Sequence, residues 1–158
     1  MRTSNNFQQT AVHSAKNFRQ PMAGLRTYLV EDSALIRENL IGTLEELSHV
    51  QVVGTAEDVP SAIEWLRDGA TVCDLAIIDI FLKRGSGLEV LQAARSIGKD
   101  LRVVVLTNFA SPEIRKRCME LGADRVFDKS NEIDTLLRYC ERLAAGEPDD
   151  SVQAVPGP

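Results

Sequence analysis

Short apolar runs alternate with longer amphipathic stretches through the middle of this sequence. The run Leu75–Ile78 contains four apolar residues, two of them β-branched, and is followed directly by Asp79. An uninterrupted apolar run of this length is typical of a strand that is buried on both faces of a sheet. Between Ser33 and Leu47, by contrast, apolar residues recur at intervals of three and four, which is the spacing of one helix face. The alternation predicts a series of strand and helix pairs.

Five strands are expected, over residues 25–30, 50–54, 74–79, 101–107 and 126–127. Five helices are expected over residues 33–47, 60–69, 88–97 and 112–122, and from a cap at Ser130 or Asn131 through Leu143. Such pairs with short right-handed connections predict an α/β fold, a doubly wound five-stranded parallel sheet with helices on both faces.

The two ends of the chain differ in composition from its middle. Residues 1–24 contain three basic residues and no acidic one, which predicts a disordered basic arm, although the same composition is typical of organelle transit peptides. Residues 146–158 are acidic and contain prolines, and a disordered tail is expected there. We expect one folded domain over residues 25–145 and no output domain.

Overall charge and cysteine content exclude several classes of function. The net charge of −5 argues against a direct nucleic-acid-binding surface, which needs a basic field. No apolar run approaches the ~20 residues that cross a bilayer, so no membrane contact is expected. The three cysteines, Cys73, Cys118 and Cys140, have neither metal-ligand nor CxxC spacing, which favours reduced thiols and a cytoplasmic location.

Polar side chains stand at the point where four of the predicted strands end. These residues are Glu31, Asp32, Asp79, Thr107 and Lys129. Because the carboxyl ends of parallel strands meet at one edge of a sheet, where ligands bind in such folds, we expect the five to lie close together. A helix cap is the structural alternative for Asp79, but Ser86 or Gly87 already stands directly before the next helix.

The chemistry of such a group follows from its charge. Carboxylates drawn together repel by about 4 kcal/mol per close pair at an effective dielectric constant near 20. A hard divalent cation relieves this repulsion, and an oxygen-only ligand set favours Mg²⁺. The hydroxyl of Thr107 and the ammonium of Lys129 suit the oxygens of a phosphoryl group, and Asp79 is then the candidate nucleophile. Each residue alone has a structural explanation, but their combination favours function.

In order and spacing, these residues resemble the receiver domain of two-component response regulators over nearly all of residues 25–145. The motifs that carry the resemblance are Val30–Ser33 with Arg37, Ile77–Asp79 with Gly87, Val105–Thr107, Gly122–Ala123 and Phe127–Ser130. The resemblance implies a flavodoxin-like (βα)5 fold with Asp79 as the phosphoacceptor. It further implies that Thr107 and Lys129 contact the phosphoryl group. The implied Mg²⁺ ligands are Glu31, Asp32, Asp79 and the backbone carbonyl of Phe81.

The resemblance also implies partners. A histidine kinase or a histidine phosphotransfer protein is expected to donate the phosphoryl group, after which the surface of the fourth helix and fifth strand changes. Without an output domain, this chain is expected to be a stand-alone receiver that binds a downstream protein, or its own copy in a homodimer. It is expected to be no enzyme beyond Mg²⁺-assisted self-phosphorylation and autodephosphorylation.

Three departures from the family pattern change the expectations. Lys83 stands where family members often have proline, and it brings a cation near the site. Asn108 and Phe109 follow Thr107 where a small residue is common, and we expect them to slow the entry of water. Val126 takes the place of an aromatic whose rotation reports phosphorylation, and Phe127 points to the opposite face of the strand.

Three alternatives to phosphoryl acceptance are compatible with parts of the sequence. The first is a pseudo-receiver, an interaction module of the same fold that is never phosphorylated, and Lys83, Asn108 and Val126 support it. The second is an Mg²⁺-dependent aspartate-nucleophile phosphatase, which requires a second aspartate where Phe81 stands. The third is a nucleotide-binding domain, which requires a glycine-rich turn after the first strand, and residues 31–34 contain no glycine.

Overall fold

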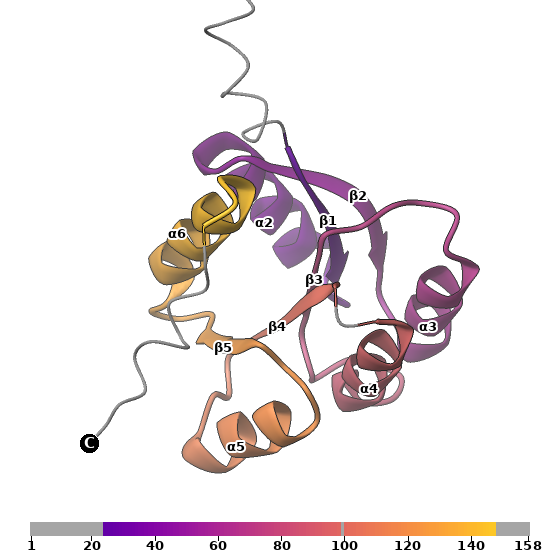
Figure 1. The fold of residues 1–158 in the computed structure, drawn as a ribbon. Helices are drawn as coiled ribbons and strands as arrows, with labels where there is room; N and C mark the ends of the chain where they lie inside the picture. The colour runs from indigo at the N-terminus through magenta and orange to yellow at the C-terminus, as the bar shows by residue number, and fades with distance from the viewer. Residues whose placement is uncertain (1–23, 99, 148–158) are drawn as a thin grey trace, which may run out of the picture.

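The computed structural model describes residues 24–98 and 100–147 of the chain. Its strands form one five-stranded sheet in the order β2-β1-β3-β4-β5, and every neighbouring pair is parallel (Figure 1). The strands are β1 (Leu25–Val30), β2 (Val50–Ala56), β3 (Leu75–Ile78), β4 (Arg102–Thr107) and β5 (Arg125–Asp128). The predicted parallel sheet is therefore confirmed.

Helices cover both faces of this sheet, as predicted. They are α2 (Ala34–Leu47), α3 (Val59–Asp68), α4 (Gly87–Ile97), α5 (Pro112–Glu120) and α6 (Ile133–Ala144). Buried side chains of α2 and α6 form one hydrophobic core with the sheet, and those of α3, α4 and α5 form the other. Figure 1 shows α2 and α6 together on one side and the remaining helices on the other.

Side-chain alternation along the strands assigns residues to the two cores. Val126 lies in the core beneath α3, α4 and α5, whereas Phe127 lies in the opposite core, with its ring centroid 5.7 Å from that of Tyr139 in α6. This confirms that the two residues of β5 face opposite ways. All four residues of β3 are fully buried, because this central strand is covered by helices on both faces.

Serine caps three of the helices, of which Ser111 was predicted as a cap, Ser86 as one of two candidates and Ser33 as the first residue of its helix. The hydroxyl of Ser33 accepts a hydrogen bond from the N–H of Ile36, and that of Ser111 accepts one from the N–H of Ile114. Ser86 caps α4 in the same way. Each of these short side chains satisfies a backbone donor that the first helical turn leaves unpaired.

The predicted start of the last helix was wrong. Residues 129–131 form a turn, and α6 begins at Ile133, so neither Ser130 nor Asn131 is its cap. Glu132 precedes the helix, but its carboxylate accepts hydrogen bonds from Arg115 and from the N–H of Asp128 instead of capping. The local cap pattern gave the wrong boundary because a contact with another helix determines this turn.

The connection after β1 determines where the sheet opens. From β1 the chain moves outward to the edge strand β2 and then returns across β1 to β3, from which it continues to β4 and β5. In this 2-1-3-4-5 order of flavodoxin-like folds, the connections leave β1 and β3 in opposite directions. A crevice consequently opens at the carboxyl ends of β1 and β3, where ligands bind in folds of this class.

Most of the predicted terminal segments lie outside the described residues. This applies to residues 1–23 of the basic arm and to residues 148–158 of the acidic tail. Gly146 and Glu147, which the prediction assigned to the tail, donate backbone hydrogen bonds to Leu143 and Arg142 in α6. Within residues 24–98 and 100–147, no helix has the length and apolar character that a membrane span requires.

Candidate functional site

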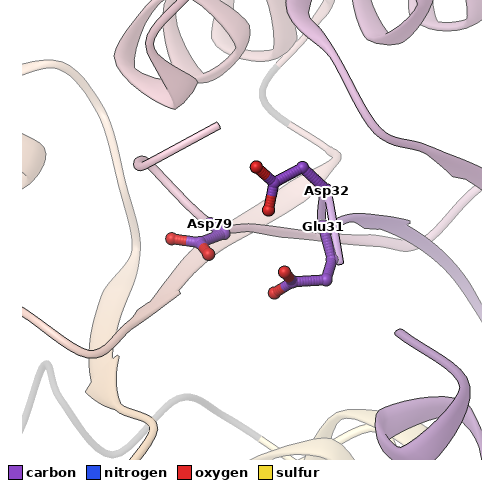
Figure 2. Close-up of side chains that lie close together, drawn as sticks. All are labelled: Glu31, Asp32 and Asp79. Atoms are coloured by element: carbon purple, nitrogen blue, oxygen red, sulfur yellow. The ribbon is translucent and has the colours of Figure 1, made fainter. Parts of the chain in front are cut away.

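Three acidic side chains meet at the carboxyl ends of β1 and β3. Glu31 and Asp32 directly follow β1, and Asp79 directly follows β3. One carboxylate oxygen from each of the three lies within 4.8 Å of the others. Figure 2 shows the three side chains side by side at these two strand ends. The edge of the sheet thus brings together acids that stand about fifty residues apart in the sequence, as predicted.

Lys129 joins two of these acids from the turn after β5. Its Nζ lies 2.6 Å from Oε1 of Glu31 and 2.8 Å from Oδ2 of Asp79, and the lysine side chain is only 10% exposed. Burial alone favours the neutral amine, but the hydrogen bonds to Asp79 and Glu31 outweigh it and raise the pKa of Lys129. Lys129 is therefore a fixed ammonium group at the floor of the site.

Backbone groups hold the acids in place. Glu31 Oε2 accepts the N–H of Ser33 at 3.1 Å, and Asp79 Oδ1 accepts the N–H of Phe81 at the same distance. From α2, the guanidinium of Arg37 donates to the carbonyl of Glu31 at 2.7 Å. Burial raises the pKa of Glu31 above the usual carboxyl value, although the hydrogen bonds from Lys129 and Ser33 oppose this effect.

Gly87 allows the loop after β3 to pack against Asp79. A Cβ at this position would lie 2.1 Å from the backbone oxygen of Asp79 and 2.5 Å from Cα of Ile80, which is closer than real contacts allow. The loop folds back so that the N–H of Gly87 donates to the carbonyl of Ile80 at 2.9 Å. Glycine is thus required for steric reasons at this position, eight residues after Asp79, since any side chain would displace the strand end.

A small cavity of about 200 Å³ opens over the acids. Its lining consists of Glu31, Asp32, Ser33, Ile36, Asp79, Phe81, Thr107, Asn108, Phe109 and Lys129. Thr107 is fully buried, and its backbone carbonyl accepts the N–H of Lys129 at 2.9 Å, which links the ends of β4 and β5. All the residues that the sequence nominated for the site therefore line one cavity.

Two aromatic rings stand at the mouth of this cavity. Phe81 and Phe109 meet edge to face with their centroids 4.8 Å apart, and they are 48% and 61% exposed. Phe81 comes from the loop after β3, and Phe109 comes from the loop after β4. The expected effect of Phe109 on water entry stays a prediction, but its position next to the opening is consistent with it.

The donor set of the cavity suits a hard divalent cation. Three carboxylates share one ammonium, which leaves a net charge of −2 when all three acids are ionised. Within the described residues, the carboxylate of Asp32 has no hydrogen-bond or ion-pair partner, and it points toward the other two acids (Figure 2). Oxygen ligands without histidine or cysteine are those that Mg²⁺ prefers. The residues present therefore fit this ion.

Sequence reasoning missed two contributors to the site. Arg37 was identified only as part of a motif, but its guanidinium fixes the carbonyl of Glu31. Its position one helical turn after the Ser33 cap is a usable signal, because that turn passes over the end of β1. Glu132 was not nominated at all. Its contacts with Arg115 and Asp128 depend on tertiary structure, and no local pattern reveals them.

Comparison with known proteins agrees with this geometry. Residues 27–141 match the family model of the response regulator receiver domain. Over 124 residues the chain is 32% identical to the nitrate/nitrite response regulator protein homolog of Haemophilus influenzae, which covers 78% of this chain and 58% of that protein. The chain spans about half the length of the curated relatives it matches.

Solved structures share the fold. A LuxR-family two-component response regulator from Aurantimonas sp. SI85-9A1 superposes with a TM-score of 0.70 at 22% identity, covering 83% of this chain and 94% of that one. A response regulator from Burkholderia pseudomallei, with a phosphorylated aspartic acid, calcium ion and citrate, gives a TM-score of 0.65 at 22% identity and covers 84% and 75%.

The family match and the fold rest on independent observations. The matched region begins in β1 and ends in α6, so it includes every strand and every loop that lines the cavity. The strand order and the structural neighbours give the flavodoxin-like (βα)5 fold without reference to any single site residue. This chain belongs to the response regulator receiver domain family of two-component systems.

Proposed function

We propose that this chain accepts a phosphoryl group on Asp79 from the phosphohistidine of a histidine kinase or a histidine phosphotransfer protein. The observation that carries the proposal is the placement of Asp79. Its carboxylate stands at the end of a fully buried strand, lines a cavity open to solvent, and is paired with a buried ammonium 2.8 Å away. A rigid strand end is suited to hold a nucleophile, because in-line transfer requires a fixed attack direction.

In the proposed reaction, a carboxylate oxygen of Asp79 forms the new O–P bond while the P–N bond to the donor histidine breaks. The imidazole nitrogen keeps the electron pair of that bond, and with the other ring nitrogen protonated the ring departs as neutral imidazole. Lys129 Nζ lies within hydrogen-bond distance of Asp79 and is placed to contact a phosphoryl oxygen. Thr107 lines the same cavity, and its hydroxyl proton is a second donor for the transferred group.

We further propose that Mg²⁺ is held by the carboxylates of Glu31, Asp32 and Asp79 and by the backbone carbonyl of Phe81. When bound, the ion neutralises charge on the acids and on the phosphoryl oxygens. The carboxylate of Asp32, which has no partner among the described residues, and the net negative charge of the cavity support this assignment. The Burkholderia structure, which shares this fold, contains a phosphorylated aspartic acid and a calcium ion, so both chemistries occur in a protein of this fold.

The proposed output is a change in protein contacts rather than a chemical product. We assign it to the exposed surface of α5 and β5, here called the α5–β5 surface, which binds a downstream protein or a second copy of the chain. In this proposal the domain catalyses only its own phosphorylation and dephosphorylation. We place the exchange in the cytoplasm, in keeping with cysteines that remain free thiols in the described structure.

Intact-mass measurement of the full chain tests the proposal. Wild type incubated with acetyl phosphate and Mg²⁺ is expected to gain one phosphoryl group, and the gain is expected to vanish in Asp79→Asn or when a chelator removes Mg²⁺. Asp74→Asn is the matched control, because Asp74 precedes the same strand at its opposite end. That variant is expected to be phosphorylated as wild type is.

Two outcomes contradict the proposal. A phosphoryl adduct that persists in Asp79→Asn would assign acceptance to another residue. Failure of wild type to gain an adduct from both acetyl phosphate and a phosphorylated histidine donor would instead favour the pseudo-receiver, and the α5–β5 surface would then be a constitutive interface.

A further inference from the structure

Arg115 joins three separate segments of the chain. From α5, its Nε donates to the carbonyl of Ala110 at 3.1 Å, and its Nη1 donates to the carbonyl of Val126 in β5 at 3.0 Å. Its Nη2 donates to the carboxylate of Glu132, directly before α6, at 2.8 Å. The planar guanidinium therefore binds the β4–α5 loop, β5 and the start of α6 at the same time.

Glu132 completes this network. Its Oε1 accepts the N–H of Asp128 at 2.7 Å as well as the guanidinium of Arg115, and its own N–H donates to the carbonyl of Asp128 at 2.8 Å. The hydrogen bond from Arg115 is the largest cause of the lowered pKa of Glu132, so the carboxylate is ionised near neutral pH. Glu132 thus fixes the end of β5 to α5 and, as shown above, does not cap α6.

The anchored segments are those that carry two residues of the cavity. Ala110 stands three residues after Thr107, and Asp128 stands directly before Lys129. The carbonyl of Thr107 also accepts the N–H of Lys129, so the two segments already touch at the cavity. A displacement of the Thr107 segment toward a phosphoryl group consequently moves the carbonyl of Ala110 relative to β5. Arg115 must then either follow that carbonyl or lose the bond, because hydrogen bonds weaken steeply with misalignment.

We propose that Arg115 is a positioning residue that holds the Thr107 and Lys129 segments in register and transmits their displacement to the α5–β5 surface. This inference rests on the proposed phosphorylation of Asp79. The two states differ in whether the guanidinium keeps all three of its bonds, which supplies the differential contact that a population shift requires. By linkage, a partner that binds the α5–β5 surface also changes the occupancy of the phosphorylated state.

The test compares amide NMR shifts of the full chain with and without beryllofluoride and Mg²⁺, which mimic the phosphoryl group. Arg115→Lys keeps the charge but removes the planar fork, and Glu132→Gln keeps the shape but removes the charge. Arg117→Lys is the matched control, because Arg117 and Glu120 form a more exposed pair on the same helix at 3.9 Å. In wild type and in this control, shift changes are expected both at the cavity and across α5 and β5.

In Arg115→Lys and Glu132→Gln, the cavity amides are expected to respond while the changes across α5 and β5 fall by half or more. The initial rate of phosphorylation by acetyl phosphate is expected to fall by about tenfold in Arg115→Lys, because small displacements of reacting groups cost rate. Undiminished changes across α5 and β5 in both variants would overturn the role of Arg115, as would their absence in wild type. Failure of wild type to bind beryllofluoride or accept phosphate would instead reject the proposed function itself, and the inference with it.

Discussion

Acidic and basic side chains stand at both edges of the sheet, but they are paired differently at the two edges. At the amino edge, Asp74 accepts two hydrogen bonds from the side chain of Arg26 and one from its backbone N–H, at 2.9–3.0 Å. Nearby, Asp124 accepts from Arg95 and from the N–H of Val103. Both of these acids have arginine partners. At the carboxyl edge, three acids share a single lysine.

The larger hollow does not lie at the edge with the candidate site. The hollow at the amino edge, lined by Arg26, Asp74 and Arg102 among others, measures about 660 Å³, whereas the cavity over Asp79 measures about 200 Å³. In the larger hollow Arg26 pairs with Asp74, whereas in the smaller one three carboxylates share one ammonium. An excess of negative charge at rigid strand ends, rather than cavity volume, therefore identifies the edge with the candidate functional site.

The largest expected difference between the edges is the change in the free energy of unfolding when one aspartate is replaced by alanine. Asp124→Ala removes partners from Arg95 and from the N–H of Val103, and we expect it to lower the free energy of unfolding by about 2 kcal/mol. Asp32→Ala in chelator is expected to cost nothing or to stabilise, because it relieves repulsion. Urea denaturation followed by circular dichroism measures both. Equal losses in the two variants would contradict the contrast between the edges.

The next effect is stabilisation by Mg²⁺. At a concentration tenfold above its Kd, the ion is expected to raise the free energy of unfolding by about 1.4 kcal/mol, because it binds the folded state alone. Thermal unfolding with and without Mg²⁺ measures this gain. The gain is expected to vanish in Asp32→Asn and to persist in Asp74→Asn, whose acid lies at the paired edge. An equal gain in stability in Asp32→Asn would show that Asp32 is not a ligand of the ion.

The smallest effect is the pH dependence of the amino edge. Burial opposes ionisation of Asp74, but its hydrogen bonds to Arg26 prevail and lower its pKa below the usual value. A lowered carboxyl pKa contributes stability above the unfolded-state pKa of about 3.9, and this contribution is lost as the pH falls further. We expect Asp74→Asn to cost about 0.5 kcal/mol at pH 7, since the pair is partly exposed, and less at pH 3. A cost that grows on acidification would contradict the assigned direction.

The fold and the core of the site could be read from the sequence because local patterns determine them. Apolar runs gave the strands, helical spacing and cap residues gave the starts of the first four helices to within one residue, and strand ends gave the five polar residues that line the cavity. Gly87 was recognised by spacing alone, and the structure supplies its steric reason.

What the sequence did not reveal depends on side chains that meet across elements. Ser130 and Asn131 satisfied the local rule for a cap, but the carboxylate of Glu132 binds Arg115 from another helix, and the turn extends to residue 131. The arginine partners of Asp124 were hidden for the same reason, since Arg95 lies 29 residues away in the sequence. Long charged side chains reach many alternative partners, so periodicity does not select among them.

The aromatic stack on the α3 side of the sheet gives the protein an optical property. Trp65 is the only tryptophan, and its ring lies parallel to that of Tyr28, with centroids 3.8 Å apart and planes 5° from parallel. The ring occupies the space above Gly54 that a Cβ would fill, and it does not line the cavity over Asp79. Tryptophan fluorescence therefore reports whether this side of the sheet is folded. Emission at one wavelength is thus enough to follow unfolding.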